Sequence, residues 1–277
     1  MFTPQLPRAA EKQRESQGWL ALAQADGWYE PDPVIDLALP DVVGKLGWDL
    51  ATGSNWLGTY HSFTHLLEHY VQPGQKVLEI GAAKTWAGAH LVQRGCRYTG
   101  FDMVVDPNIG LGRAQFYQQQ HRVEYEVVAG DAEFLPFADA SFDLVFAVAT
   151  LHHALDLPQM VAELARVTKR GGIVAGLNEG VRAFWASPEA EGQAKEKTYG
   201  INEHSYTLGD YYKAFRRAGL QIRQVTHSGR YRLFLPSKWQ SVLQTLERLP
   251  FSRGRLAISL LVNYLHPYEG LTIYGCK

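Results

Sequence analysis

A stretch of ten residues most constrains how this chain can fold: Val77-Leu78-Glu79-Ile80-Gly81-Ala82-Ala83-Lys84-Thr85-Trp86. The apolar run at 76–80 predicts a buried strand, the small residues after it a tight turn, and the apolar periodicity from Trp86 a helix. Small side chains let a ligand lie against backbone N–H groups at a helix N-terminus, where partial positive charge collects. The stretch therefore predicts a nucleotide-type site at the first strand–helix turn of an α/β sheet.

Further apolar runs alternate with helical patterns along the rest of the chain. We expect strands at 97–102, 124–128, 143–148, 173–177, 220–225 and 271–274, and helices at 60–71, 109–120, after Asp156 and at 207–218. Alternation with short turns predicts a Rossmann-like, doubly wound, seven-stranded sheet that is mostly parallel with an antiparallel last strand.

The length supports one well-buried domain with additions. The chain has 277 residues, of which 46% are hydrophobic, and two full domains would be cramped. Prolines break regular structure in the N-terminal part, so we interpret residues 1–58 as an N-terminal helical cap and 59–277 as the α/β domain. Within that domain we expect an irregular loop at 178–206 and a helical lid insertion at 228–268.

Charge and cysteine content exclude several classes. The formal net charge is −1, so the whole molecule is not an evident nucleic-acid binder. Cys96 and Cys276 have no zinc spacing and offer no disulfide framework. The N-terminus lacks the apolar segment of a signal peptide, and the apolar stretch at 256–265 is too short to span a bilayer. We expect a soluble, cytoplasmic protein. Peripheral contact with a membrane surface is compatible with the sequence.

Basic residues gather in one part of the chain. Residues 213–255 contain ten Lys and Arg residues but only one acidic residue, Glu247. A solvated basic face that balances the acidic N-terminal region is one interpretation. A surface for an anionic substrate or an anionic membrane is the other.

Three histidines, His61, His65 and His69, lie four residues apart on the predicted helix at 60–71. Histidines at i and i+4 can share a metal, but no carboxylate or cysteine follows at motif spacing. We therefore expect no metal site, and a pocket-lining role for one of these histidines is the more specific alternative.

The predicted second strand ends in an acid. Asp102 lies 21 positions after Gly81. This is near the spacing at which a carboxylate at a strand end accepts hydrogen bonds from the hydroxyls of a ribose. Further along, the sequence continues with Gly130-Asp131-Ala132-Glu133-Phe134-Leu135-Pro136-Phe137, Ser141-Phe142-Asp143-Leu144-Val145, Leu151-His152-His153 and Arg166-Val167-Thr168-Lys169-Arg170-Gly171-Gly172.

In this order and spacing, these segments resemble the class I S-adenosylmethionine-dependent methyltransferases of the small-molecule type called methyltransferase type 11. The resemblance covers roughly residues 74–177. It implies S-adenosyl-L-methionine as the cofactor and methyl transfer as the activity. The chain departs from the family at Ala83 and Thr85, which stand where glycines are usual.

The resemblance also implies a role for individual residues. Glu79 would hold the methionine amino group, while Gly81, Ala82 and Ala83 would let the chain pass close to the cofactor. Asp102 would accept both ribose hydroxyls. The remaining cofactor contacts would come from Met103, Asp131, Ala132, Ala147 and His152.

A dinucleotide-dependent dehydrogenase fits the same turn less well. Its fingerprint is Gly-x-Gly-x-x-Gly, whereas Gly81 is followed here by Ala82, Ala83, Lys84, Thr85 and Trp86. A pyrophosphate needs a close backbone approach that the alanines hinder, and a sulfonium cofactor has no phosphate.

Methyl transfer to a hydroxyl requires a base that removes a proton. The candidates near the expected methyl position are His153, His204 and Glu179, with His153 first because histidine titrates near neutral pH. A packing or cofactor-side role for the His152-His153 pair is an equal alternative.

The acceptor is the least constrained part of the prediction. The DNA-methylating motifs are absent, so nucleic acid is not expected. Aromatic and basic residues in the insertion suggest a small, ring-bearing or apolar acceptor with negative charge; these are Arg230, Tyr231, Arg232, Phe234 and Trp239. O-methylation of a small molecule is the preferred prediction. A cofactor-binding protein that acts as an interaction or membrane-surface module without methyl transfer is the alternative.

Overall fold

The computed structural model describes residues 9–29, 56–188, 191–227 and 268–277, together with 242, 261 and 264. Most of the predicted cap at 1–58 and of the insertion at 228–268 lies outside these residues, as do the acceptor candidates Arg230, Tyr231, Arg232, Phe234 and Trp239. The proposed division into domains therefore stays a prediction.

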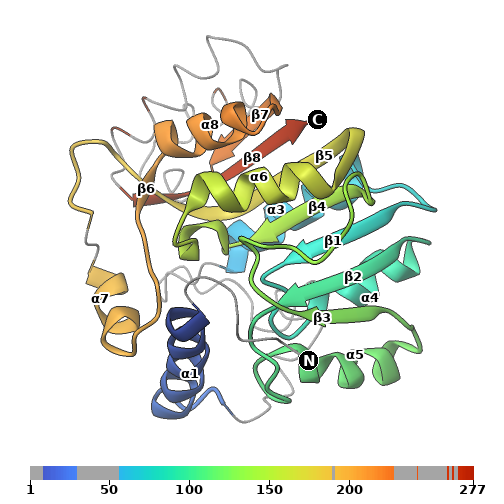
Figure 1. Ribbon diagram of the computed structural model, residues 1–277, viewed down its shortest axis with the longest axis horizontal. Coiled ribbons are helices and arrows are strands. Elements are labelled where there is room, and N and C mark those ends of the chain that lie inside the picture. Colours follow the sequence, from blue (N-terminus) through green and yellow to red (C-terminus); the bar gives the residue numbers. More distant parts are fainter. Residues whose placement is uncertain are drawn as a thin grey trace.

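A single twisted sheet forms the centre of the molecule (Figure 1). Its strand order is β3-β2-β1-β4-β5-β8-β7, and a short strand, β6, pairs with β5. The strands are β1 Lys76–Ile80, β2 Arg97–Asp102, β3 Glu126–Ala129, β4 Phe142–Val148, β5 Thr168–Arg182, β6 Tyr206–Thr207, β7 Gln221–His227 and β8 Tyr268–Cys276. Only β8 runs antiparallel to its neighbours among these strands. The predicted fold class is confirmed, with β6 as an addition to the seven expected strands.

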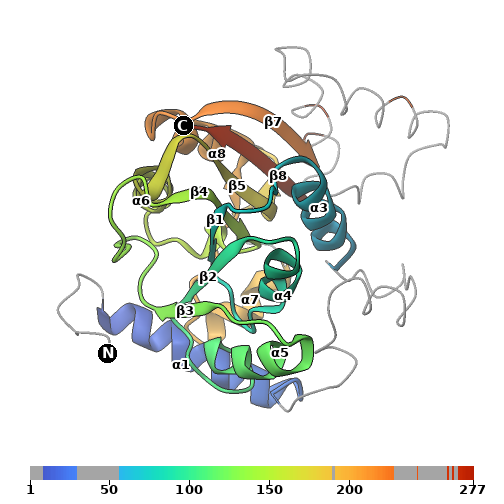
Figure 2. The ribbon, with the colours of Figure 1, turned by 90° about the vertical axis from the view of Figure 1, so that its right-hand side faces the viewer.

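Helices cover both faces of the sheet (Figure 2). The helices α3 (Trp56–His69), α4 (Trp86–Gln93) and α5 (Ala114–His121) lie on one face, and α6 (Leu157–Val167) and α8 (Leu208–Arg217) on the other. Successive residues of a strand point to opposite faces. Accordingly, Val145 packs into the core beneath α6 and α8, whereas Phe146 packs with Phe63 beneath α3 and α4.

Two helix starts follow directly from local sequence. Asp156 caps α6 by accepting a hydrogen bond from the Gln159 backbone at 3.0 Å. Thr207 and Asp210 form a reciprocal capping box at the start of α8. Both caps satisfy backbone N–H groups that have no partner inside the helix, and both confirm the predicted starts.

The fifth strand is longer than the sequence predicts. We expected strand at 173–177 and irregular chain from 178, but β5 continues to Arg182. The register shifts between Gly176 and Glu179, after which β5 pairs again with β8. An antiparallel neighbour from the far end of the chain supplies these hydrogen bonds, and local sequence does not report such a partner. The expected loop also contains a helix, α7 (Glu191–Thr198).

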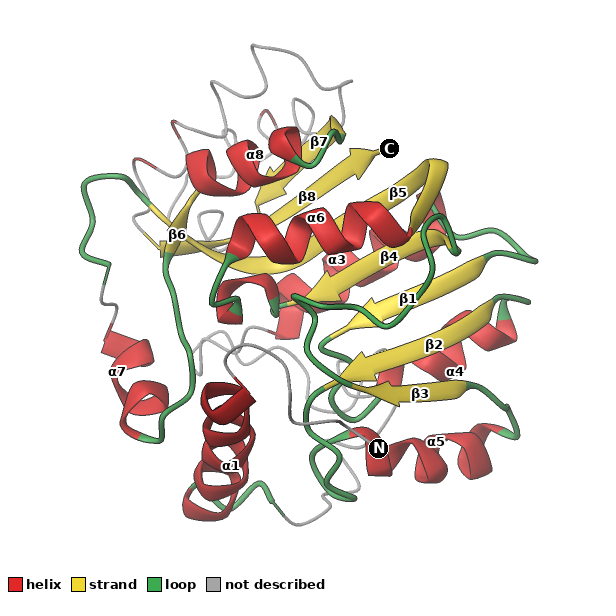
Figure 3. Cartoon of the chain, viewed as in Figure 1, coloured by secondary structure: helices red, strands yellow, loops and turns green. Residues whose placement is uncertain are grey.

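Two elements lie beside the carboxyl ends of the parallel strands (Figures 1 and 3). They are α1 (Ala9–Ala25) and α7. In open α/β sheets, ligands bind at this edge. Two 3₁₀ turns lie in the loops there, η1 (Leu111–Arg113) after β2 and η2 (Leu151–His153) after β4. In the part of the chain that the structure describes, no helix has the length and apolar content needed to cross a bilayer.

Candidate active site

A cavity of about 570 Å³ opens at the carboxyl edge of the sheet. Its sheet side is formed by residues that follow or end the strands, such as Gly81 after β1, Asp102 at the end of β2 and Thr150 after β4. Glu15 and Trp19 of α1 line it from the other side. The N-terminal helix is therefore part of this site.

The turn after β1 requires a small residue at its first position. Gly81 has φ +67°, and a Cβ atom placed there would lie 2.2 Å from the Thr150 hydroxyl oxygen. Ala83 (φ 43°) and Thr85 (φ 62°) also adopt left-handed backbone conformations, which cost L-residues with a Cβ about 1–2 kcal/mol. At the two positions where the methyltransferase family usually has glycine, this chain therefore has residues with a strained backbone, Ala83 and Thr85.

Asp102 links the end of β2 to this turn. Its Oδ2 accepts a hydrogen bond from the backbone N–H of Ala83 at 2.8 Å, and its Oδ1 accepts one from Val104 at 2.8 Å. Burial raises the pKa of Asp102, and the N–H groups of Val104, Ala83 and Met103 lower it in part. Asp102 and Met103 both line the cavity, and their contact with a nucleoside stays a prediction.

Glu79 lies behind the turn and is not among the residues that line the cavity. Its side chain is 1% exposed and accepts a hydrogen bond from the Tyr98 hydroxyl. Burial raises the pKa of Glu79 to about 8. The raised pKa favours the protonated carboxyl, so a direct charge contact with a cofactor amine would require Glu79 to lose its proton.

The other predicted cofactor residues lie at different depths. Ala132 borders a small cavity of about 40 Å³ next to the main one. Asp131 is buried and accepts a hydrogen bond from the Glu133 backbone at 3.0 Å. Ala82 and Ala147 are both fully buried, and Val148, Ala149 and Thr150 line the cavity where the prediction had Ala147.

Glu179 holds the loop after β4. Its carboxylate, 0% exposed, accepts hydrogen bonds from the Thr150 backbone at 3.0 Å and from Nδ1 of His152 at 2.9 Å. Burial by itself lowers the pKa of His152, but the hydrogen bond and charge of Glu179 raise it above its ordinary value. Neither side chain lines the cavity. Their contacts are those of a buried ion pair that shapes the loop.

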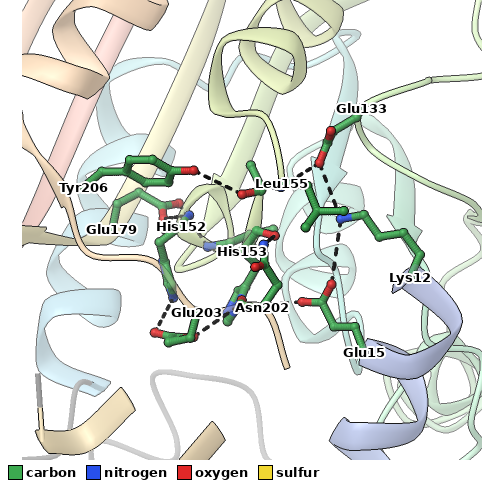
Figure 4. Close-up of polar contacts among 12 residues, drawn as sticks. Lys12, Glu15, Glu133, His152, His153, Leu155, Glu179, Asn202, Glu203 and Tyr206 are labelled. Atoms are coloured by element: carbon green, nitrogen blue, oxygen red, sulfur yellow. Dashed lines mark hydrogen bonds and ion pairs between the residues drawn. The ribbon is translucent and has the colours of Figure 1, made fainter. Parts of the chain in front are cut away.

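Of the two histidines in this loop, His153 lines the cavity, and Figure 4 shows it beside Asn202 and Glu203. Its Nδ1 lies 2.6 Å from the Asn202 carbonyl oxygen, so Nδ1 carries the proton and Nε2 is the nitrogen that can accept one. Burial, together with the charge of His152, holds the pKa of His153 well below its ordinary value. The ring is therefore neutral at pH 7.

His204, the third catalytic candidate, does not line the cavity. Its backbone N–H donates to the His152 carbonyl at 3.1 Å, and its ring lies tilted against Tyr206. Burial lowers the pKa of His204. Of the three residues proposed as a base, only His153 is brought to the cavity.

Sequence reasoning missed a group of charged residues around His153. Lys12 and Glu15 come from α1, Glu133 follows β3, and Glu203 precedes His204. Lys12 Nζ lies 3.5 Å from Glu133 and 3.8 Å from Glu15, and the three side chains are at most 5% exposed. A charged pair in a helix as polar as α1 gives no local signal that it will be buried.

The histidine stripe of α3 lies elsewhere. Nδ1 of His65 is 3.1 Å from the Tyr274 hydroxyl on β8, and His69 stacks on His65. None of His61, His65 and His69 lines this cavity, so the pocket-lining alternative gains no support from it and stays a prediction. Of the three, His65 reaches the sheet through Tyr274 and Gln224, whereas His61 and His69 are exposed.

Comparison with known proteins adds to this geometry. Residues 78–176 match the family model described as "Methyltransferase domain". The chain is 32% identical over 149 residues to phthiotriol/phenolphthiotriol dimycocerosates methyltransferase 1 of Mycobacterium ulcerans, covering 52% of this chain and 48% of that protein. It is 34% identical over 102 residues to the fatty-acid O-methyltransferase of Mycolicibacterium smegmatis, covering 36% and 35%.

Solved structures share the fold over a longer range. The geranyl diphosphate C-methyltransferase of Streptomyces coelicolor superposes with a TM-score of 0.64 at 14% identity, covering 99% of both chains. The chain spans only 18% to 56% of the length of the curated relatives that it matches.

The family match includes the turn after β1, Asp102, Asp131 and the His152-His153 loop, the same segments on which the sequence resemblance rests. The sheet order and the cavity at its carboxyl edge agree with that match. The resemblance is confirmed: this chain carries a class I S-adenosylmethionine-dependent methyltransferase domain.

Proposed function

We propose that this chain binds S-adenosyl-L-methionine in the 570 Å³ cavity and methylates a hydroxyl group of a small-molecule acceptor. The observation that carries the proposal is the position of His153, a neutral imidazole with a fixed tautomer on the wall of the cavity. A bound sulfonium cofactor supplies an electrophilic methyl group, and the chain has to align and deprotonate the acceptor.

The residues around the cavity fit such a cofactor. Gly81 lines the cavity, so a ligand can approach its backbone, and its φ and its contact with Thr150 exclude any larger residue at this position. Asp102 is fixed by two backbone hydrogen bonds and has remaining lone pairs for a ribose diol. Met103 lines the same wall and would pack on adenine.

His153 would act as the general base. Its Nδ1–H is held by the Asn202 carbonyl, which leaves Nε2 to take the proton of the acceptor hydroxyl as the oxygen gains the methyl group. A lowered pKa keeps this nitrogen unprotonated at neutral pH. Glu179 and His152 would support the loop and not take part in proton transfer.

The relatives support a small-molecule acceptor. One is named as a fatty-acid O-methyltransferase and another as a methyltransferase of phthiotriol dimycocerosates. The predicted preference for an anionic acceptor rests on the basic residues between 213 and 255, most of which lie outside the described residues. It stays a prediction, which a salt titration of acceptor affinity tests. Affinity that does not change with salt would contradict it.

An acceptor screen tests the activity itself. The purified chain would be incubated with labelled cofactor and pairs of small molecules that differ only in a free or a blocked hydroxyl. We expect S-adenosylhomocysteine only with the free hydroxyl. Cofactor binding by calorimetry without transfer to any acceptor would instead favour the alternative, a cofactor-binding protein without methyl transfer.

A further inference from the structure

Two carboxylates converge on the ring nitrogen of His153 that does not accept the proton (Figure 4). Oε2 of Glu203 lies 3.2 Å from His153 Nδ1, and Oε1 of Glu15 lies 3.9 Å from the same atom. The side chains of Glu203 and Glu15 are 11% and 2% exposed. Both acids therefore act on the imidazole with little screening by water.

The segment that carries Glu203 is clamped to the loop after β4. The side-chain amide of Asn202 donates to the His153 carbonyl at 2.7 Å, while Nδ1 of His153 points back to the Asn202 carbonyl. The His204 backbone donates to the His152 carbonyl at 3.1 Å. These contacts fix Glu203 against His153 although 50 residues separate them, and residues 202–204 lie outside the family match.

Glu15 reaches the same place from α1. Its Oε1 has no hydrogen-bond partner among the described residues, and Glu15 lines the cavity together with His153. Lys12 lies 3.8 Å from Glu15 and is shared with Glu133. A buried carboxylate oxygen without a hydrogen-bond partner is costly, and a positive charge on the neighbouring imidazole would offset that cost.

The two adjacent histidines differ in their surroundings. His152 contacts Glu179 through Nδ1 and lies 3.5 Å from Glu203 through Nε2. His153 donates to an uncharged carbonyl. Their pKa values are displaced in opposite directions, upward for His152 and downward for His153. Such a division is typical of sites in which one group stays charged and its neighbour exchanges a proton.

We propose that Glu203 and Glu15 are positioning residues for His153. The Asn202 carbonyl accepts the Nδ1–H, and the carboxylates of Glu203 and Glu15 beside it stabilise the imidazolium that forms when Nε2 takes the proton of the acceptor hydroxyl. No other bond changes at these residues, and the proton leaves His153 to solvent after transfer. The proposal rests on the proposed function, and it makes α1 a part of the catalytic site.

A divalent metal is the competing occupant of this cluster. Ligand atoms of His152, His153 and Glu203 lie within 4.8 Å of one another. Binding through Nδ1 would require that nitrogen to lose its proton, whereas its contact with the Asn202 carbonyl at 2.6 Å requires the proton to stay. The positioning role agrees with that contact.

The test compares E203Q, E203D, E15Q and the control E11Q, which changes an exposed acid on the same helix. NMR of the imidazole nitrogens gives the tautomer and pKa of His153 without any acceptor, and H153N assigns the signals. We expect E203Q to lower that pKa, E15Q to lower it less because the raised pKa of Glu15 leaves this acid largely protonated where His153 titrates, and E11Q to leave it unchanged. In turnover, E203Q should lower kcat about tenfold to a hundredfold with little change in KM, E15Q less, and E203D should recover part of the loss.

The two readouts separate the possible failures. An unchanged pKa of His153 in both E203Q and E15Q would overturn the positioning role, whatever the acceptor screen finds. A shifted pKa without methyl transfer to any acceptor would leave the positioning role intact and contradict the proposed function. Stoichiometric zinc or manganese in the purified protein, lost in E203Q, would also overturn the proposal, because Nδ1 would then bind metal.

Discussion

The backbone N–H of Ala83 donates a hydrogen bond to Oδ2 of Asp102 across 2.8 Å. This bond joins the turn after β1 to the end of β2, two neighbouring parallel strands. Asp102 therefore has two functions in the proposed site: it holds the turn in place and it offers oxygens to a ribose. Substitution of Ala83 or Asp102 should therefore weaken cofactor binding more than acceptor binding.

We expect D102A to weaken S-adenosylmethionine binding about tenfold to a hundredfold, because it removes both a turn hydrogen bond and the acceptor for two hydroxyls. D102N keeps one oxygen acceptor and should lose less. Calorimetric titration of the three proteins measures this difference. Equal affinity of wild type and D102A for S-adenosylmethionine would show that Asp102 does not contribute to cofactor binding.

Restoring glycine at Ala83 should stabilise the fold. Ala83 has φ 43°, and relief of the left-handed strain outweighs the entropy of glycine by roughly 0.5–1 kcal/mol. Thr85 is the matched comparison, because T85G also loses the hydrogen bond between the Thr85 and Tyr125 hydroxyls, 2.9 Å apart. We expect A83G to raise the free energy of unfolding in a urea titration and T85G to leave it nearly unchanged. A destabilised A83G would contradict the strain argument.

Glu15 should make the stability of the protein depend on pH. Burial raises the pKa of Glu15 from 4.5 to about 7. A raised carboxyl pKa contributes stability that is fully present below pH 4.5 and is lost as the pH rises through about 7. E15Q lacks this dependence, so from pH 4.5 to 8 it should gain stability relative to wild type on the order of 2–3 kcal/mol. Thermal melts across this range, with E11Q as the control, measure the gain.

His153 and Glu179 should give opposite phenotypes. H153N is expected to lower kcat by about 10²–10⁴-fold with cofactor affinity unchanged. E179Q should instead lower the free energy of unfolding by about 3 kcal/mol, because it disrupts a buried pair with His152. Turnover and urea unfolding of both variants separate the roles. A stable E179Q protein with a strong loss of kcat would identify Glu179 as the base instead.

His204 serves as an internal check on the choice of base. Its side chain does not line the cavity, and its fixed contact is a backbone hydrogen bond to His152. We expect H204N to keep kcat within about threefold of wild type, because the replacement preserves that bond. A loss of kcat as large as that of H153N would assign proton transfer to His204.

Local patterns were sufficient where a residue's role depends on its own neighbours in the chain. The strand–turn–helix at 76–93, the helix starts at Asp156 and Thr207, and the alternation of strands and helices were all predicted and confirmed. The family resemblance followed from the same segments and is confirmed by residues 78–176. The roles of the individual site residues stay predictions.

Other features depend on contacts between distant segments. The extension of β5 to Arg182 needs β8, about 90 residues later. The burial of Lys12 and Glu15 needs Glu133 and the cavity wall. The assignment of Glu179 to a structural pair follows from its hydrogen bonds to the loop after β4, which no spacing in the sequence predicts.

By itself, the sequence determined the order of strands and helices, the small-residue turn and the acids at strand ends, because hydrophobic period and turn chemistry are local properties. The tertiary structure alone decided which histidine reaches the cavity and which carboxylates surround it. Those outcomes depend on burial and on hydrogen bonds between α1, the loop after β4 and residues 202–204. Desolvation and charge pairing act through space, and there they distinguish His152 from its neighbour His153.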